Sequence, residues 1–383
     1  MPRNSLAKYF LASWLGCGLA TAATGAVPVP KPPPLEARAY LLTDYQSGRV
    51  LAESHADERL EPASLTKLMT SYVLFQALKE GRLKLSDTAT ISEHAWRSEG
   101  SRTFVQVGSR IPVEVLIKGM IVQSGNDATI ALAEHLGGSE AGFVEIMNQY
   151  ARTLGLTGTH FANSDGLPDP QHYTTARDMA VIARALIRDF PQYYPWYRLQ
   201  EFTWNNITQR NRNGLLSRDP TVDGLKTGHT DSAGFCLVTS ANHGGMRLIS
   251  VVLGSPSIKA REEASAALLG YGYNFFETAK VKSGGEALLT PRVYLSRDGT
   301  VPVGIARDLF VTVPRGATGG LKTATRVSAP LQAPLAAGQV VGELTVTTAD
   351  GETVAREPLV PLKGAPLGGA WTRMLDHIAL WLK

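Results

Sequence analysis

Apolar positions with helical spacing recur through the first part of the chain, and short apolar runs lie at both ends of that part. Period and length predict helices over residues 62–78, 113–121, 128–136, 143–154, 176–187 and 259–276. Turn residues bound the predicted strands, which cover residues 39–43, 49–52, 234–240 and 246–254. Strands that flank a set of helices in this way favour one antiparallel sheet with helices packed on both faces.

The first of these helices is apolar nearly all the way round, which predicts that it lies inside the domain. Pro62 suits its first turn, because proline has a helical φ and its missing N–H needs no partner there. Ser64 and Lys67 stand three positions apart and share one helical face. A hydroxyl beside a half-buried amine can act as a nucleophile, since burial makes the amine lose its proton more readily. A helix cap and a snorkelling lysine explain the same pair, and Ser-x-x-Lys also occurs at residues 5–8.

The composition changes after about Lys280, where short strands replace the helices. Strand patterns cover residues 291–295, 309–313 and 340–348, with turns at Asp298-Gly299 and Asp350-Gly351. No cluster of titratable residues stands out in this part of the sequence. We therefore expect a small all-β domain without a catalytic role.

The last segment has apolar residues at helical spacing, namely Trp371, Met374, Leu375, Ile378, Trp381 and Leu382. It is too short and too charged to span a bilayer, and tryptophans suit the headgroup region, so we expect it to lie in a membrane interface. Asp376 and His377 are expected on the opposite face. The glycine-rich residues 364–369 before it predict a flexible joint. The alternative is a terminal helix docked on the β domain.

The chain has 383 residues, 44% of them hydrophobic and 19% charged, which describes two folded domains or one large domain with an appendage. The formal net charge is +4 without a dense run of lysine and arginine, so nucleic acid is not an expected partner. The histidines are scattered and lack metal-ligand spacing. Neither a metal nor a cofactor is expected.

The N-terminus has the pattern of a secretory signal peptide over residues 1–26, with positive charge, a short apolar stretch and small residues at a cleavage site. Cys17 follows Leu-Gly, which faintly resembles a lipoprotein cleavage site. The proline-rich residues 27–38 predict an extended tether. Only Cys236 remains after cleavage, so no intrachain disulfide forms, and its apolar surroundings indicate a buried core position.

Two later motifs change the interpretation of the serine and lysine pair. Ser124-Gly125-Asn126 supplies a hydroxyl and an amide on a short turn between two predicted helices. Lys226-Thr227-Gly228 precedes the central hairpin and is expected on a strand, where the glycine lets a substrate backbone lie close and the other two side chains hold a carboxylate. Each tripeptide alone is common, but the three motifs in this order form a far more specific signature.

With these motifs the sequence resembles the penicillin-recognising serine enzymes, and most closely the low-molecular-mass penicillin-binding proteins that are D-alanyl-D-alanine carboxypeptidases. The resemblance extends over nearly the whole mature chain and includes the runs at residues 163–167, 175–178, 211–216 and 226–230. Gly125 stands where many relatives of the superfamily carry aspartate, although the carboxypeptidase branch commonly has glycine.

The resemblance implies an α+β fold. A serine DD-peptidase domain over residues 39–279 has an antiparallel sheet sandwiched by helices, as in β-lactamases and transpeptidases. An all-β domain follows over residues 280–363. Residues 364–383 form a linker and an amphipathic membrane-association helix.

The resemblance and the chemistry together imply the catalytic roles. Ser64 attacks the carbonyl between two D-alanines of a peptidoglycan peptide stem, and Lys67 is the general base. Like-charge repulsion from Lys226 helps to keep that base neutral. Ser124 relays a proton to the leaving amine, and water then hydrolyses the acyl-enzyme. The same serine is expected to be acylated by β-lactam antibiotics.

The binding roles are implied in the same way. Asn126 holds the peptide backbone of the substrate, and the backbone N–H groups of Ser64 and His229 form the oxyanion hole. The terminal carboxylate is received by Thr227. The other substrate-binding candidates are Lys226, Gly228, Arg212 and Arg261.

Three other functions remain open. A serine β-lactamase shares the motifs, but no convincing acidic deacylation motif lies between the second and third motifs, and such an enzyme has no use for a β domain. A DD-endopeptidase is closer, although it normally lacks the second domain. A non-enzymatic wall-binding protein needs no paired nucleophile and base. We therefore expect an exported DD-carboxypeptidase, attached peripherally to the periplasmic face of the bacterial inner membrane.

Overall fold

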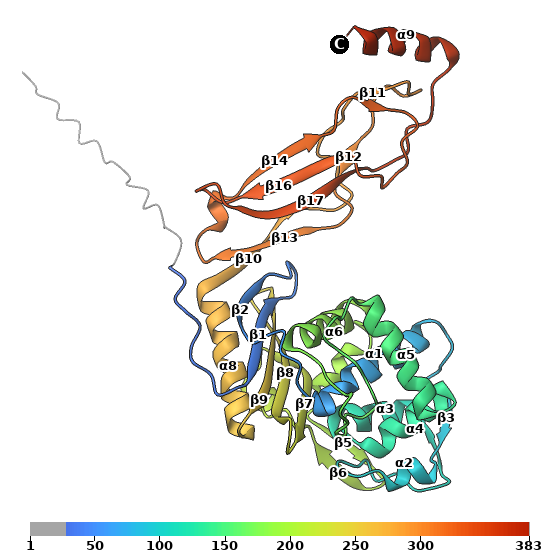
Figure 1. Cartoon of the computed structure of the whole chain (residues 1–383), viewed down its shortest axis with the longest axis vertical. Coiled ribbons are helices and arrows are strands. Elements are labelled where there is room, and N and C mark those ends of the chain that lie inside the picture. Colours follow the sequence, from blue (N-terminus) through green and yellow to red (C-terminus); the bar gives the residue numbers. More distant parts are fainter. Residues whose placement is uncertain (1–27, 383) are drawn as a thin grey trace, which may run out of the picture.

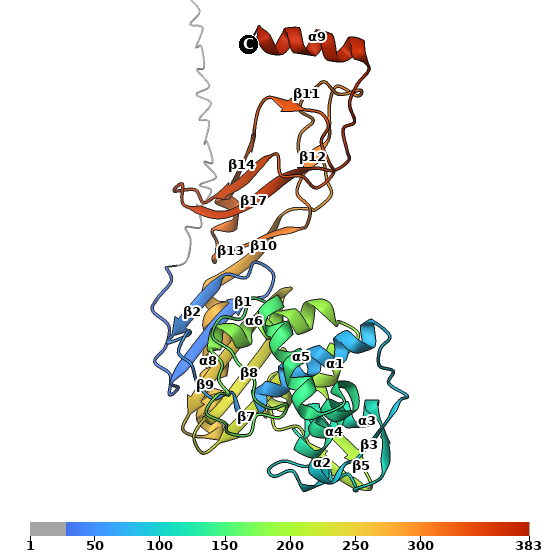
Figure 2. The same ribbon diagram turned by 45° about the vertical axis from the view of Figure 1, so that its right-hand side comes forward.

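The computed structural model describes residues 28–382, and the predicted signal peptide, including Cys17, lies outside this range. A helix-rich domain with a five-stranded sheet is followed by an all-β domain that carries a helix at its far end (Figure 1). Figure 2 shows the all-β domain extending away from the first domain as an elongated body. The predicted α+β architecture is confirmed.

The central sheet has the strand order β2-β1-β9-β8-β7, and each neighbouring pair is antiparallel. Its strands are β1 (Ala39–Asp44), β2 (Val50–Ser54), β7 (Val222–Thr230), β8 (Gly234–His243) and β9 (Met246–Ser255). Successive side chains of a strand point to opposite faces, so Leu41 packs in one core and Leu42 in the other. Because both faces are covered, the central strands are continuous apolar runs.

Helices cover the two faces unequally (Figure 1). One face packs against α8 (Ile258–Phe275), and Leu215 and Leu216 join the same core. The other packs against α1 (Lys67–Lys79), α3 (Val113–Val122), α4 (Asn126–Gly137), α5 (Glu140–Thr153) and α6 (Ala176–Asp189). Almost every residue of α1 is buried, as its all-round apolar pattern predicted.

Several short elements of this domain left no clear pattern in the sequence. They are three to five residues long, too short to show a hydrophobic period. They comprise β3 (Thr88–Thr90), α2 (Glu93–Arg97), β4 (Arg110–Pro112), the 3-10 helix η2 (Tyr194–Arg198), β5 (Glu201–Trp204), β6 (Ile207–Arg210) and α7 (Leu215–Arg218).

The all-β domain is built from a four-stranded sheet in the order β12-β17-β16-β14 and the strand pairs β10–β13 and β11–β15. The strands are β10 (Phe276–Lys282), β11 (Val293–Tyr294), β12 (Val303–Gly304), β13 (Leu309–Pro314), β14 (Lys322–Val327), β15 (Leu331–Gln332), β16 (Gly342–Thr347) and β17 (Thr353–Pro361), with the 3-10 helix η3 (Thr318–Gly320) between β13 and β14. β14 was missed because nearly all its side chains are exposed, which removes the alternation that marks a half-buried strand.

The two domains meet without a linker. α8 ends at Phe275, and β10 begins at the next residue, Phe276, whose side chain belongs to the core between α8 and the sheet. The turn between β1 and β2 adds two polar contacts to β13. The hydroxyls of Ser47 and Thr312 are 2.6 Å apart, and Arg49 Nη1 donates to the carbonyl of Thr312 at 2.6 Å. The second domain is therefore joined to the first by shared core and by hydrogen bonds.

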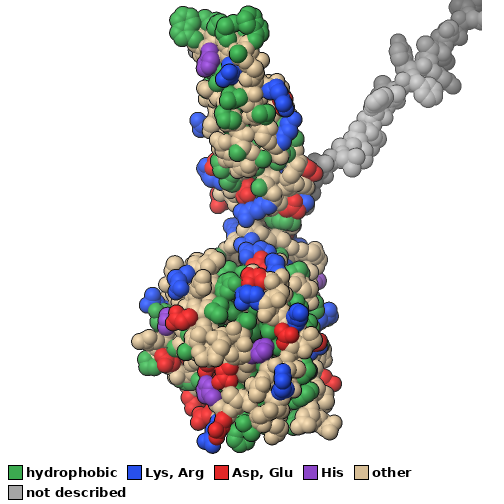
Figure 3. Space-filling model, turned by 90° about the vertical axis from the view of Figure 1, so that its right-hand side faces the viewer, with side chains coloured by type: hydrophobic (Ala, Val, Ile, Leu, Met, Phe, Trp, Pro, Cys, Tyr) green, Lys and Arg blue, Asp and Glu red, His purple; other side chains and the backbone are tan. Residues whose placement is uncertain are grey.

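The terminal helix α9 (Ala370–Trp381) docks on the all-β domain through its polar face. Asp376 is buried, its Oδ2 accepts from the N–H of Leu295 at 2.6 Å, and its Oδ1 accepts from Arg292 at 2.8 Å. The apolar face points outward, with Trp371 71% and Trp381 85% exposed, and hydrophobic side chains gather at this end of the molecule (Figure 3). The helix is thus docked and also leaves its apolar stripe uncovered in the described chain.

The segment before α9 is held more firmly than its glycines predicted. Ala365 and Leu335 exchange two backbone hydrogen bonds of 2.9 and 3.0 Å, and the N–H of Gly368 donates to the carbonyl of Leu295 at 2.8 Å. These bonds fix the joint along the surface of the β domain. No helix within residues 28–382 is long and apolar enough to cross a membrane.

Candidate active site

Ser64 lies in a short 3-10 turn, η1 (Ala63–Thr66), that leads directly into α1. Pro62 is the residue before the turn, as the sequence indicated. Ala63 has a positive φ of 47°, a conformation that costs a non-glycine residue about 1–3 kcal/mol. Leu65 is completely buried and anchors the turn, whereas Ser64 is half-buried and lines a pocket. The fold therefore presents this hydroxyl on a fixed, strained turn.

Lys67 is the first residue of α1, and its side chain is 1% exposed. Its Nζ bonds to Ser64 Oγ at 3.0 Å, to Asn126 Oδ1 at 2.7 Å and to the backbone carbonyl of Asp165 at 2.6 Å. The pKa of Lys67 is lowered to about 8, mainly by burial and in smaller part by Arg212, while Asp165 opposes the shift. A fraction of this lysine is therefore neutral near neutral pH, within reach of the Ser64 proton.

The second motif lies on the turn between α3 and α4, as predicted. Lys226 Nζ donates to Ser124 Oγ at 2.8 Å and to the carbonyl of Thr227 at 3.0 Å. Asn126 bonds to Lys67 and also donates from Nδ2 to the carbonyl of Glu99 at 2.7 Å. The second motif thus contacts both lysines, with Ser124 on one and Asn126 on the other.

The two buried lysines repel each other. Burial lowers the pKa of Lys226 well below its ordinary value, and repulsion from Lys67, Arg212 and Arg261 lowers it further. Arg212 also lowers the pKa of Lys67. A carboxylate beside Lys226 would oppose its shift and favour the ammonium.

Lys226-Thr227-Gly228 lies on β7, the edge strand of the sheet, beside the turn of Ser64. A Cβ atom at Gly228 would lie 2.9 Å from the carbonyl of Pro62 and 3.2 Å from the backbone N of Ser64. Glycine is therefore needed at residue 228 for the strand to pack on the nucleophile turn. This is a second reason for glycine there, in addition to the access that it gives a substrate backbone. The ring of His229 stacks on Phe235, with centroids 4.0 Å apart.

Gly125 is fixed by packing as well. A Cβ atom there would lie 2.0 Å from Thr103 Oγ1 and 2.9 Å from Asp127 Oδ1. Buried Asp127 holds the loop of Thr103 in place by accepting from its N–H at 2.7 Å and from that of Val105 at 3.2 Å. An aspartate side chain at residue 125 does not fit unless this loop moves.

The three motifs meet at one pocket of about 390 Å³. Its lining includes Ser64, Ser124, Asn126, Arg212, Thr227, Gly228, His229 and Arg261, all named from the sequence. Lys67 and Lys226 lie behind this lining, and they hydrogen-bond to Ser64 and Ser124 respectively. The guanidinium of Arg261 donates to the backbone carbonyls of Gly228 at 3.2 Å and Cys236 at 3.4 Å, so it also holds β7 and β8 in place.

A loop without an assigned role in the sequence completes the pocket. Asp165, Gly166 and Leu167 line it, and Gly166 has a φ of 91°. A Cβ atom at Gly166 would lie 1.9 Å from the carbonyl of Ala63, so only glycine fits against the nucleophile turn. The adjacent Asp and Gly indicate a turn, but nothing in the local sequence shows that this turn contacts Ser64.

Cys236 is buried in β8, as its apolar surroundings predicted, and burial raises the pKa of its thiol to about 11. A thiol with so high a pKa stays protonated and is a poor nucleophile. Within residues 28–382, no group of three or more His, Cys, Asp or Glu side chains is placed to hold a metal ion.

A serine hydroxyl within 3.0 Å of a buried amine, a second serine on a second lysine, and an edge strand beside them define a serine enzyme of the penicillin-recognising class. Comparison with known proteins gives the family within that class. The D-alanyl-D-alanine carboxypeptidase family model matches residues 26–257, and the model of the penicillin-binding protein 5 C-terminal domain matches residues 276–365. The chain belongs to the D-alanyl-D-alanine carboxypeptidase family of serine peptidases.

Two of the relatives described below match nearly the whole length of this chain, and a third matches a shorter part. The D-alanyl-D-alanine carboxypeptidase DacA of Escherichia coli strain K12 is 44% identical over 360 residues, which cover 92% of this chain and 89% of that protein. The crystal structure of penicillin-binding protein 5 from Haemophilus influenzae matches with a TM-score of 0.85 and 44% identity, over 88% of this chain and 99% of that one. Penicillin-binding protein D2 of Listeria monocytogenes, solved in its ampicillin-bound form, is 28% identical with a TM-score of 0.59, over 64% of this chain and all of that one.

Proposed function

We propose that this protein removes the terminal D-alanine from peptidoglycan pentapeptide stems through an acyl-enzyme on Ser64. The observation that carries the proposal is the buried amine of Lys67, which lies 3.0 Å from Ser64 Oγ and has its pKa lowered to about 8. A serine hydroxyl is a weak nucleophile without a base, and a neutral amine at this distance is such a base. The ampicillin-bound relative supports acylation of the same serine by β-lactam antibiotics.

In the acylation step, Ser64 Oγ bonds to the carbonyl carbon of the penultimate D-alanine while its proton passes to Lys67. Backbone N–H groups of Ser64 and His229 receive the negative charge on the carbonyl oxygen. The C–N bond then breaks, and the proton that Lys67 took from Ser64 passes through Ser124 to the leaving amine, which leaves Lys67 neutral again. The terminal D-alanine departs, and an ester on Ser64 remains.

Substrate binding uses the edge strand. The peptide backbone lies beside β7, with Asn126 bonded to its amide, and the terminal carboxylate meets the hydroxyl of Thr227 and the charge of Lys226. Arg212 adds positive charge on the pocket wall. Burial and repulsion lower the pKa of Lys226, and a bound carboxylate would raise it, so binding of the anionic end and protonation of Lys226 are coupled.

Hydrolysis follows when water attacks the ester, with Lys67 again as the base. The domain organisation favours a carboxypeptidase over a β-lactamase, which has no use for a second domain. In the domain division that we propose, the catalytic domain spans residues 39–275 and the all-β domain residues 276–363, because β10 begins at Phe276, four residues before the boundary expected from the sequence. The linker with its membrane helix covers residues 364–383. Residues 1–26 are the export signal, and residues 27–38 are the tether that follows it.

For the location, we propose that α9 attaches the mature protein to the periplasmic face of the inner membrane. The outward-facing apolar stripe of α9, with Trp371 and Trp381 exposed, supports attachment to a membrane surface. Burial of an apolar side chain contributes roughly 1.5–3 kcal/mol when complete and less in shallow insertion. Asp376 keeps the stripe facing outward, because it ties the opposite face of the helix to the β domain.

A pentapeptide stem tests the proposal directly. Mass analysis after incubation is expected to show loss of one alanine, and labelled penicillin is expected to appear on the peptide that contains Ser64. Cleavage of cross-linked stems alone would indicate a DD-endopeptidase, and rapid turnover of penicillin would indicate a β-lactamase. Binding of peptidoglycan without any cleavage or labelling would indicate a wall-binding protein.

A further inference from the structure

The loop of residues 163–167 places the backbone of Asp165 against the catalytic base and buries its carboxyl group in the wall of the same pocket. The backbone carbonyl of Asp165 accepts from Lys67 Nζ at 2.6 Å, and the Asp165 side chain is 2% exposed. Its Oδ1 accepts from the N–H of Leu167 at 3.0 Å, whereas its Oδ2 is buried with no hydrogen-bond partner among the described residues. A buried carboxylate oxygen without a hydrogen-bond donor destabilises the folded state. Its presence in the pocket therefore indicates a role other than stabilising the loop.

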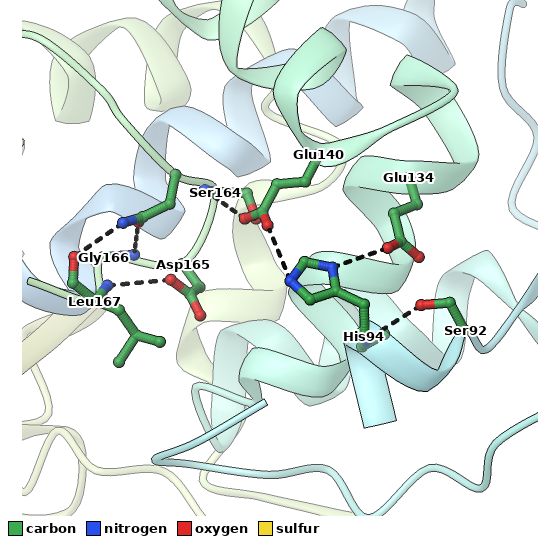
Figure 4. Close-up of polar contacts among 10 residues, drawn as sticks. Ser92, His94, Glu134, Glu140, Ser164, Asp165, Gly166 and Leu167 are labelled. Carbon is green, nitrogen blue, oxygen red and sulfur yellow. Dashed lines mark hydrogen bonds and ion pairs between the residues drawn. The ribbon is translucent and has the colours of Figure 1, made fainter. Parts of the chain in front are cut away.

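Contacts from α5 and α1 fix this loop, and Figure 4 shows the contact from α5, between Glu140 and Ser164. The N–H and hydroxyl of Ser164 donate to Glu140 Oε1 at 3.0 and 2.6 Å, and the Ser164 carbonyl accepts from Thr70 of α1 at 2.6 Å. On its other side Glu140 Oε2 lies 3.7 Å from His94 Nε2, and His94 Nδ1 lies 3.1 Å from Glu134. The residue before Asp165 is therefore bound on both sides, and Asp165 stays against Lys67.

We propose that Asp165 is a positioning residue that keeps the Lys67 amine protonated until the pH rises, and that Glu140 holds Asp165 in this position through Ser164. The inference rests on the proposed function, because it takes Lys67 as the base for acylation. According to this proposal, the loop of residues 163–167 sets the pH above which the rate of Ser64 acylation rises.

The charges around Lys67 give the direction of the effect. Asp165, Asp127 of α4 and Glu140 of α5 favour the ammonium, and Asp165 is the largest of these influences. Positive charge opposes it from Arg212, from Lys226 on β7, and from His172 when that ring is protonated. Burial raises the pKa of Asp165, and the ammonium of Lys67 opposes this shift, so each group favours the charged form of the other.

The negative charge of Asp165 counteracts the effect of burial on the pKa of Lys67, and its removal takes that influence away. The pKa of Lys67 then falls below about 8, and the neutral amine is present at lower pH. An opposite charge at short range shifts a pKa by roughly 1–3 units, and we take the low end because no side-chain hydrogen bond joins the two groups. A shift of about one unit increases the neutral fraction at pH 6 about tenfold.

The test is the pH dependence of acylation by a labelled penicillin, measured from pH 5 to pH 10 on the mature protein and on Asp165→Asn, which keeps the shape of the side chain. The acid limb is the low-pH part of the profile, where the acylation rate rises with pH. In the variant, the midpoint of this limb is expected about one pH unit lower, so that the variant reacts several-fold faster than the natural protein at pH 6. Loss of a purely structural group would lower the rate at every pH and would not move the limb. An unchanged acid limb in a folded Asp165→Asn protein overturns the proposal.

Asp169→Asn is the matched control, because this aspartate lies four residues away and is not among the charges that shift Lys67. Its acid limb is expected to stay in place. If Asp165→Asn does not fold, Glu140→Gln serves instead, since it keeps an acceptor for Ser164 and removes a charge of the same sign; its limb is expected to move the same way by a smaller amount. A Glu140→Gln limb that stays in place, or moves to higher pH, also overturns the proposal. Failure of the proposed function would appear differently, as absence of any label on Ser64 in the natural protein.

Discussion

Substitution of Gly228 by alanine tests how closely the edge strand packs on the nucleophile turn. The added Cβ would lie 2.9 Å from the Pro62 carbonyl, whereas ordinary Cβ contacts begin at 3.4 Å, so the strand or the turn must move by about 0.5 Å. A misplacement of 1 Å at a catalytic group can cost about a hundredfold in rate, so we expect about a tenfold slower acylation. Overpacking of this kind destabilises by roughly 1–3 kcal/mol, and the backbone of residue 228 needs no positive φ, so the protein is expected to fold.

The assay is the second-order rate of acylation of Ser64 by a labelled penicillin, with unfolding in denaturant measured in parallel. Gly270→Ala is the control, because a Cβ at that position of α8 meets nothing within 4 Å. Alanine there is expected to stabilise the helix by about 0.5–1 kcal/mol and to leave the acylation rate unchanged. A Gly228→Ala protein that acylates at the natural rate would refute the reasoning, because it would show that the strand does not limit the position of Ser64.

Three further predictions concern the base, the nucleophile and the helix. Ser64→Ala should lower peptide turnover by about 10⁶-fold and abolish penicillin labelling, as removal of other catalytic serines does, and label on another residue would contradict the assignment. Lys67→Arg should abolish acylation near neutral pH, because arginine keeps the charge but cannot accept a proton, while circular dichroism should show that the fold persists. Lys226→Arg should have a milder effect on acylation. Near-normal acylation of Lys67→Arg would mean that another group is the base. Replacement of both Trp371 and Trp381 by glutamate should abolish co-sedimentation with anionic vesicles and leave activity on small peptides unchanged, whereas retained binding would mean that α9 is only a structural cap.

The sequence supported much of the site because three motifs depend on residue type and order. Ser64, Ser124 and Lys226 each stand on the kind of element that their neighbours predicted, namely a helix start, an inter-helix turn and a strand. What could not be predicted depends on contacts between distant segments. The approach of Asp165 to Lys67 joins residues 98 positions apart, and no local pattern encodes it.

The terminal helix α9 also shows which features the sequence predicts and which contacts it does not. Its period correctly predicted an amphipathic helix, and its tryptophans predicted an exposed apolar face. The role of Asp376 was not visible, because a charged residue on a polar face is usually solvated. The positions of the Leu295 N–H and of the Arg292 guanidinium in the β domain make this carboxylate a docking group.

The absence of a linker between α8 and β10 has a mechanical consequence. With Phe276 set in the core of the catalytic domain, bending at this junction would expose an aromatic ring, so the two domains resist bending against each other. Under the proposed attachment through α9, the pocket would stay at a nearly constant distance from the membrane and would move mainly when the whole molecule tilts. The length of the β domain would then set which peptide stems the pocket can reach.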